Sequence, residues 1–98
     1  MLFVIMCTDK PDCNELRMAV RPQHLAYLKT YEKYIKVCGP LLNKDEKSCG
    51  SLIMIEMDDR AAAEGFADSD PYTKAGLFES VIIRPMKMIA SDGKMLAT

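Results

Sequence analysis

His24 is the only histidine in the chain, and imidazole is the side chain that most readily exchanges a proton near neutral pH. It lies in register with Leu28, Tyr31 and Ile35 on the apolar face of a predicted helix. A polar group on such a face needs a partner. Two interpretations therefore stand side by side: a core histidine bonded to a carbonyl, or an acid–base catalyst.

Two arginines precede His24 on the same predicted helix. Arg17 and Arg21 stand seven and three residues before it, so all three side chains can share one side of the helix. Two guanidinium groups beside an imidazole suit an anionic or phenolic ligand. The alternative is a pair of solvated arginines near the start of a helix.

Asp70 stands directly before Pro71. In this position it is expected to cap a short helix over residues 72–75, with proline at the first helical position. The functional alternative is a carboxylate that fixes the tautomer of His24 and stabilises its imidazolium.

The cysteines at positions 7, 13, 38 and 49 form no C-x-x-C pair, and with one histidine they give no recognisable zinc or iron–sulfur spacing. No metal site is therefore expected. Cys7 and Cys38 lie in apolar segments and are expected to behave as small hydrophobic residues, while Cys13 and Cys49 fall in predicted loops and are expected to be more accessible. Because neither G-x-G-x-x-G nor a P-loop occurs, no nucleotide cofactor is expected.

The elements that position these residues follow from the hydrophobic pattern. Pro22 either kinks the first helix or marks its true start at Arg21, and Pro85 indicates that the last strand lies at a sheet edge or carries a bulge. The predicted elements are a strand over 2–7, a helix over 15–35, strands over 37–42 and 51–57 joined by a loop over 43–50, a helix capped by Asp58 or Asp59 that ends before a turn at 68–71, and a strand over 77–89.

This β-α-β-β-α-β order predicts an α+β, ferredoxin-like fold, and the length predicts a single domain over residues 1–98. In the first strand Phe3 and Ile5 alternate with Val4 and Met6, so both faces of the sheet are apolar. Two helices can cover only one of these faces. We therefore expect a homodimer in which the other faces pack together, which is the dimeric α/β barrel arrangement.

The formal net charge is -1 and the pI is near 5.8, so the protein has no positive field to attract a phosphate backbone. We therefore do not expect it to bind nucleic acid. The apolar run at residues 2–7 is too short for a signal sequence or a membrane span. We expect a protein without a membrane partner, with free thiols in the reducing cytoplasm.

Several motifs taken together resemble the YCII-related family, from Met1 to about Met88. They are M-L-F-V-I at 1–5, Arg17, R-P-Q-H-L-A-Y-L at 21–28, C-G-P at 38–40, F-A-D-S-D-P-Y at 66–72 and A-G-L-F at 75–78. Each motif is short, but their shared order and spacing make the resemblance specific.

The resemblance implies a dimeric α/β barrel with a pocket between helix and sheet, where His24 and Asp70 would form the active pair. Gly39, Pro40 and Ser51 would line the same region. The substrate-binding residues expected on this basis are Arg17, Arg21, Ser51 and Phe78. The segment 43–48 is short and charged where relatives often carry a longer glycine-rich loop.

One activity within the family is removal of HCl from a chlorinated hydroxyhydroquinone. The resemblance thus implies a cofactor-free lyase of the dehydrochlorinase type, acting on a phenolic or quinoid small molecule in aromatic compound degradation. Two alternatives remain open: a module that binds a small metabolite without catalysis, and a cofactor-free oxygenase on the same barrel.

Overall fold

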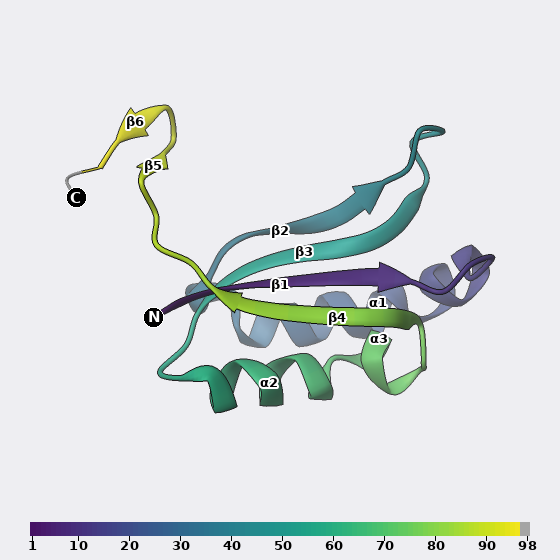
Figure 1. The fold of residues 1–98 in the computed structure, drawn as a ribbon. Coiled ribbons are helices and arrows are strands. Elements are labelled where there is room, and N and C mark those ends of the chain that lie inside the picture. Colours follow the sequence, from purple (N-terminus) through teal and green to yellow (C-terminus); the bar gives the residue numbers. More distant parts are fainter. Residues whose placement is uncertain (97–98) are drawn as a thin grey trace.

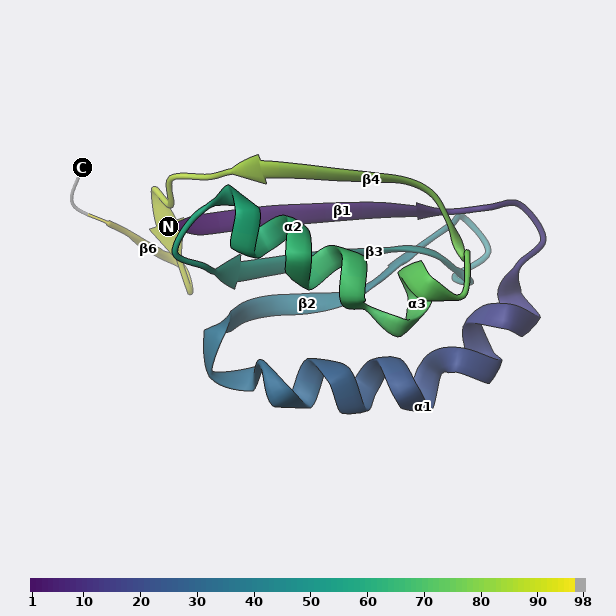
Figure 2. The same ribbon diagram turned by 90° about the horizontal axis from the view of Figure 1, so that it is seen from below.

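A computed structural model describes residues 1–96. A four-stranded antiparallel sheet with strand order β2-β3-β1-β4 carries all three α-helices on one face (Figures 1 and 2). The elements are β1 Leu2–Asp9, α1 Asn14–Thr30, a 3-10 turn Glu32–Tyr34, β2 Ile35–Leu42, β3 Ser48–Glu56, α2 Arg60–Ser69, α3 Pro71–Lys74, β4 Phe78–Pro85, β5 Ala90–Ser91 and β6 Lys94–Met95.

The α+β class and the ferredoxin-like order predicted from the sequence are confirmed. The short helix α3 and the β5–β6 hairpin are added to the basic pattern. Residues 97 and 98 of the predicted domain lie outside the described residues.

The first helix begins within one residue of the predicted start, at Asn14, but it ends earlier than predicted. It ends at Thr30 rather than Ile35, because the Tyr31 N–H bonds the Leu28 carbonyl in a tighter turn and Ile35 already belongs to β2. Pro22 lies inside the helix, so the alternative start at Arg21 is wrong. The helix continues through the proline because side chains on both sides of it, Arg17 and His24, are buried. Figure 2 shows α1 bending toward its N-terminal end.

The second half of the chain also needs corrections. Helix α2 runs to Ser69, so Asp68 and Ser69 are helical and not part of a turn. Its cap is Asp59, whose side chain accepts the Ala62 N–H at 2.8 Å. Cys49 lies in β3 rather than in a loop.

Strand β4 is an edge strand, as Pro85 indicated, but it stops at that proline and not at Ile89. Proline has no N–H with which to continue the ladder. The chain then leaves the sheet and forms the β5–β6 hairpin, whose turn holds Asp92 and Gly93 at positive φ.

The core lies between the sheet and the helices. Phe3 and Ile5 of β1 and Ile55 of β3 point toward α2, where Phe66 and the small side chain of Ala63 meet them. All five are at most 2% exposed. This packing fixes α2 against the sheet and leaves the other end of the sheet, beside α1 and α3, for the polar residues described below.

The opposite face of the sheet is also apolar and carries none of the three α-helices (Figure 1). The register places Met6 of β1 between Leu52 of β3 and Ile82 of β4 on this outer face. Met6 and Ile82 are 37% and 45% exposed. An apolar strand face of this kind indicates an interaction surface.

No helix within residues 1–96 has the length and apolar character needed to cross a membrane.

A homodimer remains a prediction, and the outer face gives it a direct test. Sedimentation should show a species of twice the 11.0 kDa mass of one chain at micromolar concentration. Met6→Lys places a charge at the centre of the outer face and should convert this species to monomer. Ala26→Lys, at an exposed position on α1, is the control and should leave it dimeric. A wild-type protein that sediments as a monomer would contradict the prediction.

Candidate active site

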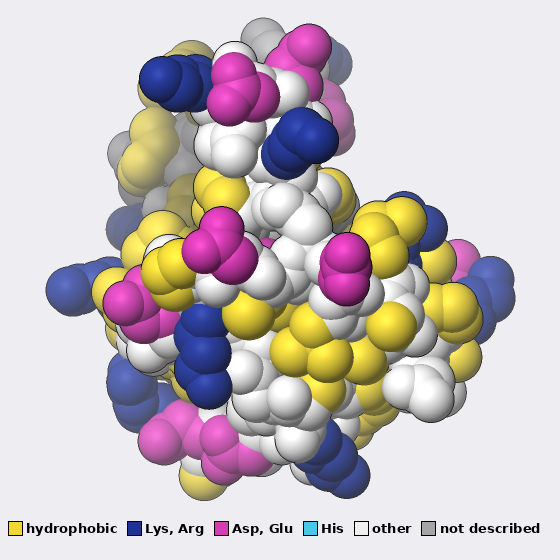
Figure 3. All heavy atoms as spheres, turned by 90° about the vertical axis from the view of Figure 1, so that its right-hand side faces the viewer, with side chains coloured by type: hydrophobic (Ala, Val, Ile, Leu, Met, Phe, Trp, Pro, Cys, Tyr) yellow, Lys and Arg dark blue, Asp and Glu magenta, His cyan; other side chains and the backbone are white. Residues whose placement is uncertain are grey.

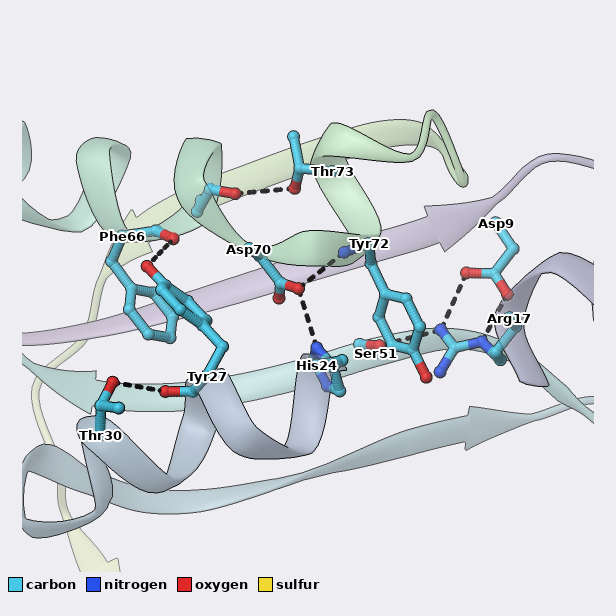
Figure 4. Close-up of polar contacts among 11 residues, drawn as sticks. Asp9, Arg17, His24, Tyr27, Thr30, Ser51, Phe66, Asp70, Tyr72 and Thr73 are labelled. Carbon is cyan, nitrogen blue, oxygen red and sulfur yellow. Dashed lines mark hydrogen bonds and ion pairs between the residues drawn. The ribbon is translucent and has the colours of Figure 1, made fainter. Parts of the chain in front are cut away.

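The centre of the candidate site is the pair His24 and Asp70. The His24 Nδ1 atom lies 2.8 Å from Asp70 Oδ1 (Figure 4), and the two residues are 7% and 3% exposed. No histidine atom is visible on the face seen in Figure 3, which agrees with this burial. An ionised Asp70 can only accept, which assigns the hydrogen of this bond to Nδ1; in a neutral imidazole the Nε2 lone pair is then left for a ligand.

Asp70 also caps α3, as the sequence predicted. The same Oδ1 atom accepts the Tyr72 N–H at 2.9 Å, and Pro71 occupies the first turn. Both interpretations of Asp70 are therefore correct, because the same oxygen atom caps the helix and binds His24. The first interpretation of His24, a core histidine bonded to a backbone carbonyl, is not what the structure shows, because its Nδ1 pairs with Asp70.

Arg17 is the second polar centre, and it is not a solvated arginine. It is 4% exposed. Its Nε and Nη2 atoms donate to the two carboxylate oxygens of Asp9 at 2.7 and 2.9 Å, and Nη2 also donates to Ser51 Oγ at 2.9 Å. Burial lowers the pKa of the Arg17 guanidinium, but the hydrogen bond and charge of Asp9 outweigh it, so the net shift is upward.

Asp9 was not identified from the sequence. It ends β1, close to the turn that leads into α1, and its side chain is 7% exposed. The only available signal was an acidic residue at the end of an apolar strand with an arginine eight residues later, which is too common a pattern to single out.

Tyr72 was not identified either, although it belongs to the D-P-Y motif. Its ring stacks on His24, with centroids 3.9 Å apart and 20° between the planes. The Arg17 guanidinium carbon lies 4.6 Å from the same ring centroid. Figure 4 shows Tyr72 between these two side chains.

A pocket of about 200 Å³ opens between α1, β2 and β3. His24, Arg17 and Ser51 contribute polar side chains to it, and Tyr72 and the exposed Arg21 line it as well. The other lining residues are Met18, Leu25, Leu28, Cys38, Gly39, Pro40, Ser48 and Ile53. The mixture of apolar walls and a few converging polar groups is typical of small-molecule sites.

The predicted residues thus fall into two groups. Arg17, Arg21, His24 and Ser51 meet at the pocket, together with the expected Gly39 and Pro40. Phe78 does not line it; this ring packs edge-on against Tyr72 at a centroid distance of 5.9 Å. The structure therefore places Phe78 behind Tyr72 and not against a ligand.

Two cysteines near the site have different environments. Cys7 is buried, and burial together with the nearby charge of Asp70 raises the pKa of its thiol to about 12, against the smaller opposing effect of Arg17. Cys38 lines the pocket and is exposed as a residue, yet burial raises the pKa of its thiol, as expected for a cysteine in an apolar strand. Among residues 1–96, no group of three or more His, Cys, Asp or Glu side chains is placed to hold a metal ion.

The comparisons with known proteins agree with this arrangement. Residues 1–87 match the sequence pattern of the YCII-related domain. The chain belongs to the YCII-related family. Protein YciI of Escherichia coli is 37% identical over 97 residues, with 91% of this chain and 99% of that protein covered. An uncharacterized protein of Haemophilus influenzae is 35% identical over the same coverage.

Among solved structures, this YCII-related chain is similar to 5-chloro-2-hydroxyhydroquinone dehydrochlorinase (TftG) from Burkholderia phenoliruptrix AC1100, in complex with 2,5-dihydroxybenzoquinone. The TM-score is 0.84 at 35% identity, with 89% of this chain and 94% of that chain covered. An antibiotic biosynthesis monooxygenase matches with a TM-score of 0.52 at 14% identity, over 90% of this chain and all of its own, which shows the shared fold alone. The fold is that of ferredoxin-like dimeric α/β barrels.

The Arg17–Asp9 pair generates a stability prediction. Asp9→Asn removes the charge that balances a buried guanidinium and should lower the free energy of unfolding by about 3 to 5 kcal/mol. Asp12→Asn is the matched control, because Asp12 is exposed and its positive φ suits asparagine. Urea unfolding of the three proteins checks this, and equal midpoints for Asp9→Asn and wild type would contradict it.

The thiol environments generate a second prediction. At pH 8, a thiol reagent should label the native protein fastest at the exposed Cys49, more slowly at Cys38, whose thiol pKa is raised by burial, and at Cys7 only after unfolding. The raised pKa keeps Cys7 protonated, and burial blocks access. Mass spectrometry of the labelled peptides identifies the sites, and rapid labelling of native Cys7 would show that its environment is misassigned.

Proposed function

We propose that this protein is a cofactor-free dehydrochlorinase that removes HCl from a chlorinated, hydroxyhydroquinone-like ring in aromatic compound degradation. The observation that carries the proposal is the buried His24–Asp70 pair beside a 200 Å³ pocket. The similarity to TftG, whose name states this activity and whose structure holds a quinone, supports the same chemistry.

His24 would be the proton carrier. Asp70 holds the hydrogen on Nδ1, so Nε2 is a base in the resting state, and the carboxylate stabilises the imidazolium after proton uptake. The stabilisation is available because the pair is buried, where a hydrogen bond between charged groups is stronger than in water. General acid–base catalysis then needs no metal or organic cofactor for proton transfer.

The reaction balances without an oxidant. His24 takes a proton from one phenolic hydroxyl and returns it to the ring carbon that bears chlorine, which gives the keto form. The carbon–chlorine bond then breaks as a second hydroxyl loses its proton. The products are a hydroxyquinone, chloride and one proton. The electron pair that leaves with chloride takes the ring from the hydroquinone to the quinone level.

The other polar groups of the pocket suit the oxygens of such a ring. Ser51 Oγ already accepts a hydrogen bond from Arg17, so its own O–H is available to donate to a ligand. Because Asp9 balances the charge of Arg17, the second arginine, Arg21, would supply the net positive charge that stabilises a phenolate. We therefore assign stabilisation of the phenolate to Arg21 alone. Arg17 would instead hold Ser51 in position.

His24→Ala should lower chloride release from 5-chloro-2-hydroxyhydroquinone by about 100- to 10,000-fold in kcat/KM, because it removes the proton carrier. Chloride is measured with an ion-selective electrode in parallel with quinone absorbance. Gln23→Ala, at the exposed neighbouring position, is the control and should behave as wild type. Asp70→Asn should also lose activity, although asparagine can still cap α3, so this variant separates the catalytic role of Asp70 from its structural role.

The alternatives give different results in the same experiment. A cofactor-free oxygenase would consume dioxygen without releasing chloride, which an oxygen electrode detects. A binding module would bind 2,5-dihydroxybenzoquinone in a titration and release nothing from any chlorinated hydroquinone. A folded His24→Ala variant with full chloride release would rule out the proposed mechanism.

A further inference from the structure

Tyr72 is one of the most deeply buried large side chains, at 1% exposure, and it contacts both polar centres of the site. One of its neighbours is His24, at a ring centroid distance of 3.9 Å, and the other is the Arg17 guanidinium, 4.6 Å from the ring centroid. The dehydrochlorinase scheme uses neither the ring nor the hydroxyl of this residue. Its position between the proton carrier and a buried cation nevertheless has a mechanical consequence.

A single hydrogen bond does not fix an imidazole. The bond between His24 Nδ1 and Asp70 Oδ1 sets one atom, but the ring can still tilt about that line, since the terminal torsion of histidine is broad. Tilting would carry Nε2 away from the ligand. The nearly parallel ring of Tyr72, with 20° between the planes, removes this freedom by lying against the imidazole.

Tyr72 contacts the His24–Asp70 pair through both its backbone and its side chain. Its backbone N–H donates to Asp70 Oδ1 at 2.9 Å, and this atom is the one that accepts from His24. Its side chain supplies the stack. One residue at the start of α3 therefore orients both the carboxylate and the imidazole, through atoms that mutagenesis can separate, because a side-chain substitution leaves the backbone N–H in place.

The tyrosine ring is itself held in place. Phe78 packs edge-on behind it, with 78° between the planes, and Arg17 lies beside it. Arg17 is in turn fixed by Asp9 and Ser51. Burial raises the pKa of the Tyr72 hydroxyl, with the charges of Arg17 and Arg21 opposing, so the phenol stays neutral at physiological pH. A neutral ring can stack on His24 in either protonation state.

We propose that Tyr72 is a positioning residue whose ring, and not its hydroxyl, sets the plane of His24 so that Nε2 faces the pocket, with Phe78 and the Asp9-bound Arg17 as its supports. The proposal rests on the proposed function for its kinetic consequence only. The orientation of His24 can be measured whether or not the protein turns over a substrate.

Because His24 is the only histidine, NMR of protein labelled with ¹⁵N in histidine gives one imidazole spin system without assignment ambiguity. Wild type and Tyr72→Phe should both show the Nδ1–H tautomer and ring protons shifted by the stacked aromatic ring. Tyr72→Met keeps an apolar side chain but no aromatic ring, so the imidazole should lose the ring-current shift and show faster ring motion in relaxation measurements, while Asp70 still holds the hydrogen on Nδ1. Unchanged imidazole signals in a folded Tyr72→Met variant would overturn the proposal.

The kinetic test uses the same pair of variants on 5-chloro-2-hydroxyhydroquinone. Tyr72→Phe keeps the stacked ring and should lose far less kcat than Tyr72→Met, which should lose about 10- to 100-fold in kcat with little change in KM, since a misplaced catalytic group costs rate more than binding. Equal losses in both variants would assign the role to the hydroxyl and contradict the proposal. If the wild-type protein releases no chloride, the proposed function is contradicted, but the NMR experiment still tests whether Tyr72 orients His24.

Tyr72→Met removes a buried ring and can fail to fold. In that event Phe78→Leu serves instead, because it removes the edge-on support while Tyr72 stays in the chain. It should shift the His24 ring protons in the same direction as the loss of stacking, by a smaller amount. His24 signals identical to wild type in a folded Phe78→Leu variant would then count against the proposal.

Discussion

The arrangement of this site depends on one oxygen atom, Asp70 Oδ1. It lies at the junction of two helices, where the chain takes an extended conformation between the end of α2 and the start of α3. From there it accepts one hydrogen bond from the backbone of Tyr72 and one from His24 on α1. A carboxylate at 3% exposure is costly unless it is paired, and these two donors offset that cost. Helix capping and the orientation of the imidazole are therefore one structural constraint.

A second buried charge is handled in the same way. The Arg17 guanidinium is bound by Asp9 at the end of β1 and by Ser51 of β3, so it joins the first helix to two strands. The proline between Arg17 and His24 interrupts the helix ladder, yet both residues on either side of it are anchored. Arg17 thus ties α1 to the sheet, and His24 ties it to the start of α3.

The pocket and the apolar outer surface lie on opposite faces of the sheet. The face covered by helices holds the core and the pocket, which includes Ser51 and Ile53 of β3. The outer face, with Met6 and Ile82, is apolar and carries no helix. A second copy on that face would therefore leave the pocket between α1 and the sheet unobstructed. Since fold alone does not determine function in barrels of this kind, the chemistry has to be argued from the groups in the pocket.

The sequence by itself determined the periodicities, and with them the order of strands and helices, the α+β class and the edge position of the strand that contains Pro85. It also indicated that His24 needs a partner and that Asp70 is suited to cap a helix, because both depend on local spacing. The family motifs brought these two residues together. Element ends were predicted less well: Ile35 continued the helical spacing although it begins a strand, since period alone cannot place the point at which tertiary packing takes over.

Only the tertiary structure decided which polar residues are buried and what they contact. Asp9 and Arg17 lie eight residues apart across a turn, and Arg17 reaches Ser51 across 34 positions of sequence. Nothing in their local patterns distinguishes them from solvated surface charges. Tyr72 likewise stacks on His24 only because α3 meets α1, and Phe78 packs against Tyr72 and does not line the pocket. Local spacing governs which element a residue joins, but burial and pairing are set by contacts between segments that are remote in sequence, so they are decided only when the chain has folded.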